Sequence, residues 1–239
     1  MSPKVPVRII YNCKCYLVVN KPIGVFSQMP DLAKWASNND GNPPPVLLDL
    51  VRTEANNKGQ SAEEWRTVHR LDTNVTGGVL IAKTKSAAAS FSKNLRKGGN
   101  AGNKLIRKYI ALVDGETNHI PDQGHLEYDG MKSWFRKIDS GALALQLCTG
   151  RKHQIRLQLS KIGIPIKNDL KYGGAPINGA GRQIGLHSAM IHTQVGLQRR
   201  KHLIAINSGQ ESLWSEYIDD CGNFKPAVER ILLEDWVFD

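Results

Sequence analysis

One carboxylate stands apart in this chain. The segment TVHRLDTNVTGG (Thr67–Gly78) contains Asp72, which is the only Asp or Glu between Glu64 and Asp114. A carboxylate among cations should remain ionised, and an ionised Asp can serve as a salt-bridge partner, a metal ligand or a nucleophile. The residues alone favour a salt bridge, because most Asp–Arg neighbours are structural. The Gly-Gly pair that follows allows another backbone to approach closely.

Other chemistries have weaker support. Glycoside hydrolysis normally uses two carboxylates, and no second acid lies near Asp72 in the sequence. His69, His153 and His187 lack the spacing that puts two ligands on one helix face, so a zinc-dependent nucleic-acid hydrolase is only a minor alternative. The chain has no G-x-S-x-G elbow, no P-loop and no G-x-G-x-x-G after a strand. We therefore expect neither a metal nor a cofactor.

The charge balance indicates a polyanionic partner. The 239 residues carry a formal net charge of +10, and eight Lys or Arg with no acid lie between Lys83 and Lys108. Two further basic groups lie at residues 151–156 and 199–201. Such clusters can be solvated surfaces, but they also suit a phosphate backbone, so we expect RNA or DNA as partner. No apolar run approaches the roughly 20 residues that span a bilayer, and we expect no membrane association.

The predicted elements favour an α+β fold, with a mixed, mainly antiparallel sheet flanked by helices. Apolar runs ended by turn residues predict strands at residues 16–22, 78–83, 107–115 and 142–150. Helical periodicity predicts helices at residues 45–55, 86–99, 151–163 and 227–236. We expect Ser86 and Thr149 to cap two of these helices, and Gly98–Gly99 and Gly163 to end them.

Ordered blocks of the sequence resemble the RluA family of RNA pseudouridine synthases. VHRLDTNVTGGVLIAK (68–83) resembles the family's H-R-L-D-x-x-T-S-G-L-L-x-x-A-K motif. VVNKPIGVFSQ (18–28) is similar to its K-P-x-G block, and RKYIALVDG (107–115) to its tyrosine strand. TGRKHQIRLQLSKIGIPIKNDLKYGG (149–174) resembles T-G-R-x-H-Q-I-R…G-x-P-I-x-G-D-x-x-Y-G, and GLHSAMI (185–191) the late L-H-A strand.

The sequence departs from this pattern at four positions. Val75 and Thr76 stand where the family usually has Thr-Ser, Gln158 where His is common, and Asn168 where Gly is common. None of the four is a reacting group in the family, so the departures concern substrate choice more than activity.

The resemblance implies the pseudouridine synthase catalytic fold and isomerisation of uridine in RNA. In that reaction the N-glycosidic bond breaks, the uracil turns and C5 bonds to C1′, without metal or cofactor. By the resemblance Asp72 is the catalytic carboxylate and Arg156 is the arginine paired with it. Tyr109 matches the active-site tyrosine, which packs on the flipped base. Whether Asp72 attacks the sugar or removes a sugar proton stays open.

Further residues are assigned to substrate binding by the same resemblance. Arg70 would fill the space left by the displaced base, and Ile155 would wall the uracil pocket. His69 and Gln154 would position other groups, with plain packing as the alternative. Lys21 would bracket the site, with a surface lysine as the alternative.

The resemblance also guides expectations about substrate and organisation. We expect one catalytic domain over residues 1–239 without the S4-like domain of many relatives, acting as a monomer on RNA. The Asn-rich loops and FSQMPD (26–31) are most similar to fungal mitochondrial members that act on large-subunit rRNA. We therefore expect an rRNA substrate and a mitochondrial location. A tRNA substrate, a cytoplasmic location and a non-catalytic RNA-binding role in ribosome assembly are the alternatives.

Overall fold

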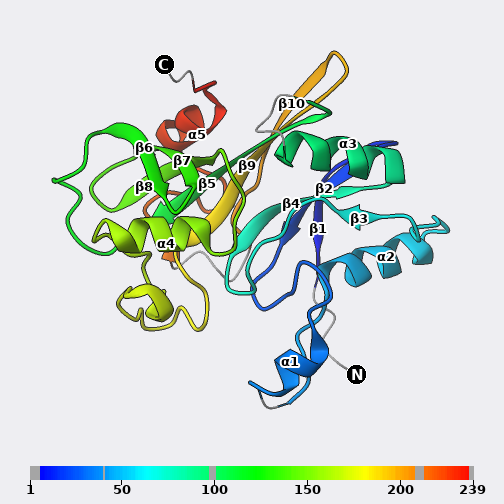
Figure 1. The fold of residues 1–239 in the computed structure, drawn as a ribbon, viewed down its shortest axis with the longest axis horizontal. Coiled ribbons are helices and arrows are strands. Elements are labelled where there is room, and N and C mark those ends of the chain that lie inside the picture. The colour runs from blue at the N-terminus through cyan, green and yellow to red at the C-terminus, as the bar shows by residue number, and fades with distance from the viewer. Residues whose placement is uncertain (1–5, 40, 97–100, 208–212, 237–239) are drawn as a thin grey trace.

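A ten-stranded sheet forms the centre of the protein (Figure 1). The computed structural model describes residues 6–39, 41–96, 101–207 and 213–236. The sheet order is β1-β2-β4-β9-β5-β8-β7-β6, with β3 pairing to β4 and β10 pairing to β9. The strands are β1 Arg8–Asn12, β2 Tyr16–Lys21, β3 Arg66–Thr67, β4 Thr76–Ala82, β5 Lys104–Leu112, β6 Gln123–Tyr128, β7 Met131–Lys137, β8 Ala142–Leu147, β9 Leu186–Val195 and β10 Gln198–Leu203.

The two halves of the sheet meet where β4 pairs with β9. This pairing is parallel, through Thr76↔His187 and Gly77↔Ser188, whereas the other pairings among the described strands are antiparallel. The predicted mixed, mainly antiparallel sheet is therefore confirmed, as are the four predicted strands within a few residues.

Helices cover both faces of the sheet, because alternate residues of its strands point to opposite sides. On one face, Leu17 and Val19 of β2 pack with α2 and α4; on the other, Tyr16 and Val18 pack with Phe91 of α3. A further cluster holds α5 against β5 and β9. The helices are α1 Leu32–Ala36, α2 Leu47–Asn57, α3 Lys85–Arg96, α4 Gln154–Lys161, the 3₁₀ turn η1 Leu170–Tyr172 and α5 Pro226–Leu233. In the described ranges no helix is both long and apolar enough to cross a membrane.

Two predicted helix caps are wrong. The backbone N–H of Ala87 donates to Oγ1 of Thr84 at 3.1 Å, so Thr84 rather than Ser86 caps α3. Thr149 lies too far before α4 to cap it, and its hydroxyl instead accepts the backbone N–H of Lys132. Gly163 does end α4, at φ +80°, while Gly98–Gly99 lie outside the described residues.

Candidate active site

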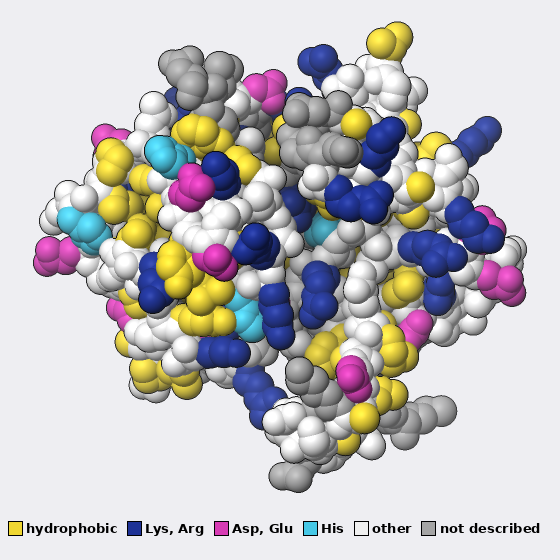
Figure 2. Space-filling model, viewed as in Figure 1, with side chains coloured by type: hydrophobic (Ala, Val, Ile, Leu, Met, Phe, Trp, Pro, Cys, Tyr) yellow, Lys and Arg dark blue, Asp and Glu magenta, His cyan; other side chains and the backbone are white. Residues whose placement is uncertain are grey.

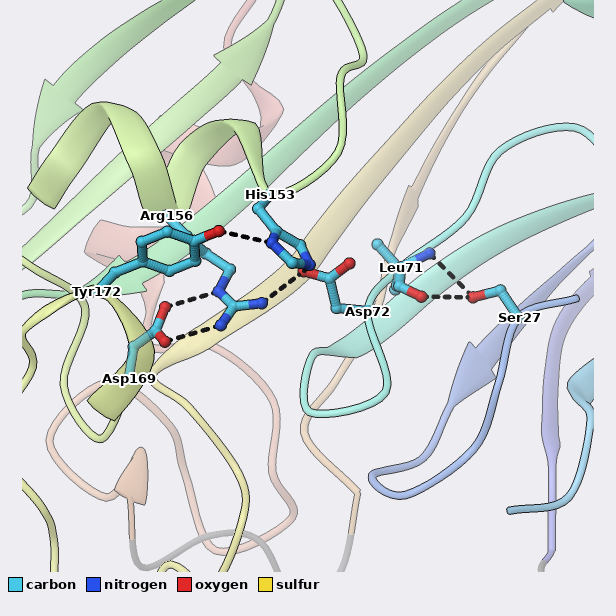
Figure 3. A network of polar contacts seen from close by, with 7 residues as sticks. All are labelled: Ser27, Leu71, Asp72, His153, Arg156, Asp169 and Tyr172. Atoms are coloured by element: carbon cyan, nitrogen blue, oxygen red, sulfur yellow. Dashed lines mark hydrogen bonds and ion pairs between the residues drawn. The ribbon is translucent and has the colours of Figure 1, made fainter. Parts of the chain in front are cut away.

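Asp72 lies in the turn that leads directly into β4. Its backbone carbonyl accepts the N–H of Val75 at 3.1 Å, which fixes the turn, and its side chain retains 20% exposure. One carboxylate oxygen, Oδ2, faces Arg156 and His153, and no described side chain forms a hydrogen bond or ion pair with the other oxygen, Oδ1. The turn therefore presents Oδ1 to the surroundings while Oδ2 is held in place (Figure 3).

Arg156 connects Asp72 to a second carboxylate. It lies in the first turn of α4, and its Nη1 donates to Asp72 Oδ2 at 2.9 Å, so the predicted pair is present. Its Nε and Nη2 donate to the two oxygens of Asp169 at 2.6 and 2.8 Å, in the planar fork that only Arg can supply. Burial opposes the charged guanidinium, but the bonds from Asp169 and Asp72 raise the pKa of Arg156 above its ordinary value.

His153 and Tyr172 complete the network in Figure 3. Nε2 of His153 lies 3.5 Å from Asp72 Oδ2, and its Nδ1 shares a hydrogen bond of 2.7 Å with the Tyr172 hydroxyl. The Tyr172 ring also stacks on the guanidinium of Arg156, 4.8 Å from its centroid. Burial lowers the pKa of His153, Asp72 opposes that shift and Arg156 adds to it. His153 adopts φ +57° at the start of α4, and its ring lies against Asp72.

Asp169, His153 and Tyr172 were not assigned from the sequence. All three lie in the block at residues 149–174 that carried the resemblance, so the signal was present. The missing information was the fold, because Asp169 follows Arg156 by 13 residues across the end of a helix. Asp72 is thus isolated along the sequence but not in space.

Lys21 is fully buried beside this network, so the alternative of a surface lysine is wrong. Its ammonium donates to the carbonyls of Pro22 and Val25 at 3.0 and 2.9 Å, and to that of Thr73 at 3.4 Å. Burial lowers the pKa of Lys21 to about 7, although Asp72 opposes the shift. Lys21 therefore ties the K-P-x-G block to the turn that carries Asp72.

A cavity of about 380 Å³ opens beside Asp72, and we name it the Tyr109 hollow. The apolar side chains that line it include Val75, Tyr109, Ile155 and Leu186, which come from four separate segments. Burial raises the pKa of Tyr109, while Arg107 opposes that shift. Arg107 also lines the hollow, and its buried Nε has no hydrogen-bond partner among the described residues, a feature the sequence did not reveal.

The remaining predicted residues lie around this hollow in different ways. Arg70 is exposed at its mouth. His69 is buried, accepts the N–H of Leu80 at 3.1 Å through Nε2, and has its pKa lowered to about 3 by burial. Gln154 accepts the hydroxyl of Thr149 at 2.8 Å and donates to Ser133 at 2.9 Å, so it joins α4 to the neighbouring strands.

The three histidines considered for zinc have separate environments. His187 is held between the Thr76 hydroxyl and the carbonyl of Ile204, at 2.7 and 2.8 Å. His69 and His153 are engaged elsewhere, as described above. Across the described part of the chain, no three His, Cys, Asp or Glu side chains form a group that could hold a metal ion.

A second cavity of about 510 Å³ adjoins the first, and we name it the Lys171 hollow. The two hollows share Arg70, Asp72 and Arg156 as a common wall. Cations dominate their linings: Arg70, Arg96, Arg107, Arg151, Lys152, Arg156, Lys171 and Arg182, against the acids Asp72 and Asp169. Figure 2 shows Lys and Arg side chains gathered along the hollowed strip between the α4 side and the α2–α3 side.

Comparison with known proteins agrees with this geometry. A family model described as RNA pseudouridylate synthase matches residues 15–161. The chain is 46% identical over 230 residues to a 21S rRNA pseudouridine(2819) synthase of Eremothecium gossypii, covering 95% of this chain and 87% of the relative. It is 40% identical to the protein of the same description from Saccharomyces cerevisiae, covering 99% of both chains.

Solved structures show the same fold at lower identity. Human RNA Pseudouridylate Synthase Domain Containing 4 superposes with a TM-score of 0.64 at 19% identity, covering 87% of this chain and 91% of that one. Human RNA Pseudouridylate Synthase Domain Containing 1 gives a TM-score of 0.64 at 18% identity, covering 100% of both chains. The pseudouridine synthase fold expected from the sequence motifs is thereby confirmed.

Proposed function

The chain belongs to the RNA pseudouridylate synthase family, and we propose on that basis that it converts a uridine of 21S rRNA to pseudouridine in mitochondria. The observation that carries this proposal is the Asp72–Arg156 pair at the wall of the Tyr109 hollow. The choice of RNA rests on the relatives described as 21S rRNA pseudouridine synthases. The mitochondrial location follows from that substrate.

The reaction is an isomerisation, so it needs no co-reactant. The C1′–N1 bond of uridine breaks, the uracil turns, a C1′–C5 bond forms, C5 loses its proton and N1 gains one. Asp72 acts on the sugar, either by attack on C1′ or by removal of a sugar proton. Arg156 holds Oδ2, which leaves Oδ1 directed at the substrate, and a fixed carboxylate lowers the entropic part of the barrier.

The target base must leave its stack to reach this carboxylate, at a cost of a few kcal/mol. The Tyr109 hollow has a volume of about 380 Å³, within the range of small-ligand pockets. The Tyr109 ring packs on the uracil, and the Ile155 side chain packs against the uracil as one wall of the pocket. Arg70, exposed at the mouth, takes the space that the base leaves.

The remaining roles follow from position. The cations that line both hollows bind the phosphates that flank the target. His69, Gln154 and Lys21 position the backbone around Asp72. Because residues of a single chain build both hollows, we propose that one catalytic domain acts as a monomer.

The direct test is Asp72→Asn, which keeps the shape of the side chain but removes its charge. We expect conversion of uridine in a 21S rRNA fragment to fall at least roughly 1,000-fold, because the reacting group is lost. RNA affinity should change little. Asp122→Asn, at a carboxylate that is 97% exposed on its side chain, is the matched control and should retain full turnover.

The outcome separates the alternatives. Near-normal turnover by Asp72→Asn would contradict the catalytic assignment. Conversion of tRNA but not of 21S rRNA would show that tRNA is the substrate. RNA binding without any conversion by the unaltered protein would support a non-catalytic role in ribosome assembly. Mapping of pseudouridine in total RNA, with and without the protein, identifies the uridine.

A further inference from the structure

The proposed isomerisation places the target base in the Tyr109 hollow and leaves the Lys171 hollow without a base. It is the larger of the two cavities, at about 510 Å³, and lies across the Asp72–Arg156 wall from the Tyr109 hollow. Its other lining residues include Met29, Asn74, Leu170, Lys171 and Arg182. A cavity of this size beside the catalytic carboxylate is large enough to bind another part of the RNA substrate.

Two walls of the hollow are fastened to the catalytic network. The Ser27 hydroxyl bonds to both the N–H and the carbonyl of Leu71 at 2.9 Å, which holds the 26–30 segment next to Asp72. Figure 3 shows this contact on one side of Asp72 and the Arg156–Asp169 fork on the other. The fork fixes the start of η1, which carries Leu170 and Lys171.

Asn168 fastens the third wall. Its Nδ2 donates to the carbonyls of Gly181 and Gln183 at 3.1 and 2.5 Å, and its Oδ1 accepts the N–H of Ile177 at 3.0 Å. It has φ +64°, a conformation that Gly and Asn tolerate best. Asn therefore keeps the backbone shape that Gly would allow and adds three bonds that hold the 177–183 segment. The hollow is thus formed before any ligand arrives.

The chemistry of the hollow combines apolar surface with unneutralised positive charge. Met29 and Leu170 are 61% and 67% exposed, and both line this cavity. Lys152, Lys171 and Arg182 lie here too, and no described carboxylate is within ion-pair distance of them. Unstacked bases in RNA complexes lie against apolar or aromatic side chains while cations hold their phosphates.

We propose that the Lys171 hollow binds a second unstacked nucleotide, the one adjacent in the RNA chain to the target uridine. Its base lies against Met29 and Leu170, and its phosphate contacts Lys171 and Arg182. This inference rests on the proposed function, since it places the target uridine in the Tyr109 hollow. Because the two cavities share a wall, two nucleotides joined by a single phosphodiester can occupy them at the same time.

The test compares RNA fragments with and without the neighbouring bases. Three 21S rRNA fragments are made, each containing the target uridine before conversion. One is intact, one has an abasic site at the nucleotide directly 5′ of the target uridine, and one has an abasic site at the nucleotide directly 3′ of it. For the unaltered protein we expect one of the two abasic fragments to raise KM about tenfold. The double variant Met29→Ala/Leu170→Ala should raise KM on the intact fragment by a similar factor, and should no longer respond to that abasic site.

The control is Leu197→Ala, in the turn between β9 and β10. Leu197 is 99% exposed and lines neither hollow, so its KM should match that of the unaltered protein. Met29 and Leu170 are largely exposed, so their truncation should leave the melting temperature nearly unchanged.

Equal KM for all three fragments with the unaltered protein would overturn the proposal. So would a double variant that still responds to the abasic site as the unaltered protein does. Failure of the unaltered protein to convert the intact fragment would instead contradict the proposed function, so the two failures are distinguishable.

Discussion

Two carboxylates share Arg156, but their roles differ. Asp169 is almost fully buried and both of its oxygens accept bonds from the guanidinium. Asp72 retains 20% exposure, and only its Oδ2 is engaged. Asp169 therefore positions Arg156, and Arg156 positions Asp72, which is the residue that faces the substrate in the proposed reaction.

At this scale we predict that Asp169→Asn slows the chemical step without weakening RNA binding. Loss of the fork lets Arg156 shift, and a misplacement of about 1 Å can cost roughly 100-fold in rate. We expect kcat to fall about 10- to 100-fold, with KM within about threefold, and stability to fall by about 2 kcal/mol. Single-turnover conversion and urea unfolding measure the two effects.

A change in KM alone would show that Asp169 acts on RNA rather than through Arg156. Asp122→Asn, which removes an exposed carboxylate, should leave both constants unchanged.

The sequence motifs marked the candidate catalytic residues, but not the residues that hold them in place. Asp72, Tyr109 and Arg156 lie in motifs whose letters alone mark them, and the structure brings Asp72 and Arg156 to 2.9 Å. The contact of Asp169 with Arg156 depends on how the chain returns after α4. The path of the chain from the end of α4 back to Asp169 follows no local spacing rule, so the contact between Asp169 and Arg156 could not be predicted from the sequence.

At the scale of elements, the glycine pair after Asp72 joins the two halves of the sheet. Gly77 has φ +110°, and a Cβ there would lie 2.4 Å from the carbonyl oxygen of Ser188 on β9. The parallel β4–β9 pairing begins at this point. The sequence suggested a close backbone approach here, and the structure confirms that β9 makes it.

We predict that Gly77→Ala destabilises the protein by at least about 3 kcal/mol, through backbone strain and overlap with β9. Gly59→Ala is the matched control. Gly59 also has positive φ, at +72°, but nothing lies within 4 Å of its Cβ position, so only the strain of about 1 kcal/mol applies. Urea unfolding of both variants measures the difference. Equal costs would mean that the close contact with β9 is unimportant.

Several strands that the sequence missed have few buried apolar residues. The β6–β7 hairpin (123–137) alternates exposed and buried residues over short strands, and many of its side chains are polar. The β10 strand begins with three exposed residues, Gln198 to Arg200. Apolar periodicity cannot predict such strands, because their pairing partners rather than their own side chains hold them in place.

At the scale of the whole molecule, the sheet buries several histidines in neutral form. Burial lowers the pKa of His187 to about 4, although its bond to the Ile204 carbonyl opposes the shift, and lowers that of His69 to about 3. His202 has its pKa lowered to about 4, mainly by burial. All three lie in or beside the strands that join the two halves of the sheet. The cohesion of the sheet is therefore linked to pH.

The sign of this linkage gives the last prediction. Below pH 6.5 the unfolded chain binds protons at these histidines and the folded chain does not. Their contribution to the free energy of unfolding is therefore fully present above pH 6.5 and is lost as pH falls toward 4. The difference between the ordinary histidine pKa of 6.5 and a pKa of about 4 corresponds to about 3 kcal/mol for His187. We expect His187→Gln to be less stable than the unaltered protein at pH 7, but to lose about 3 kcal/mol less between pH 7 and pH 4. Urea unfolding across this range measures the slope. Parallel slopes for His187→Gln and the unaltered protein would show that His187 does not carry the acid sensitivity.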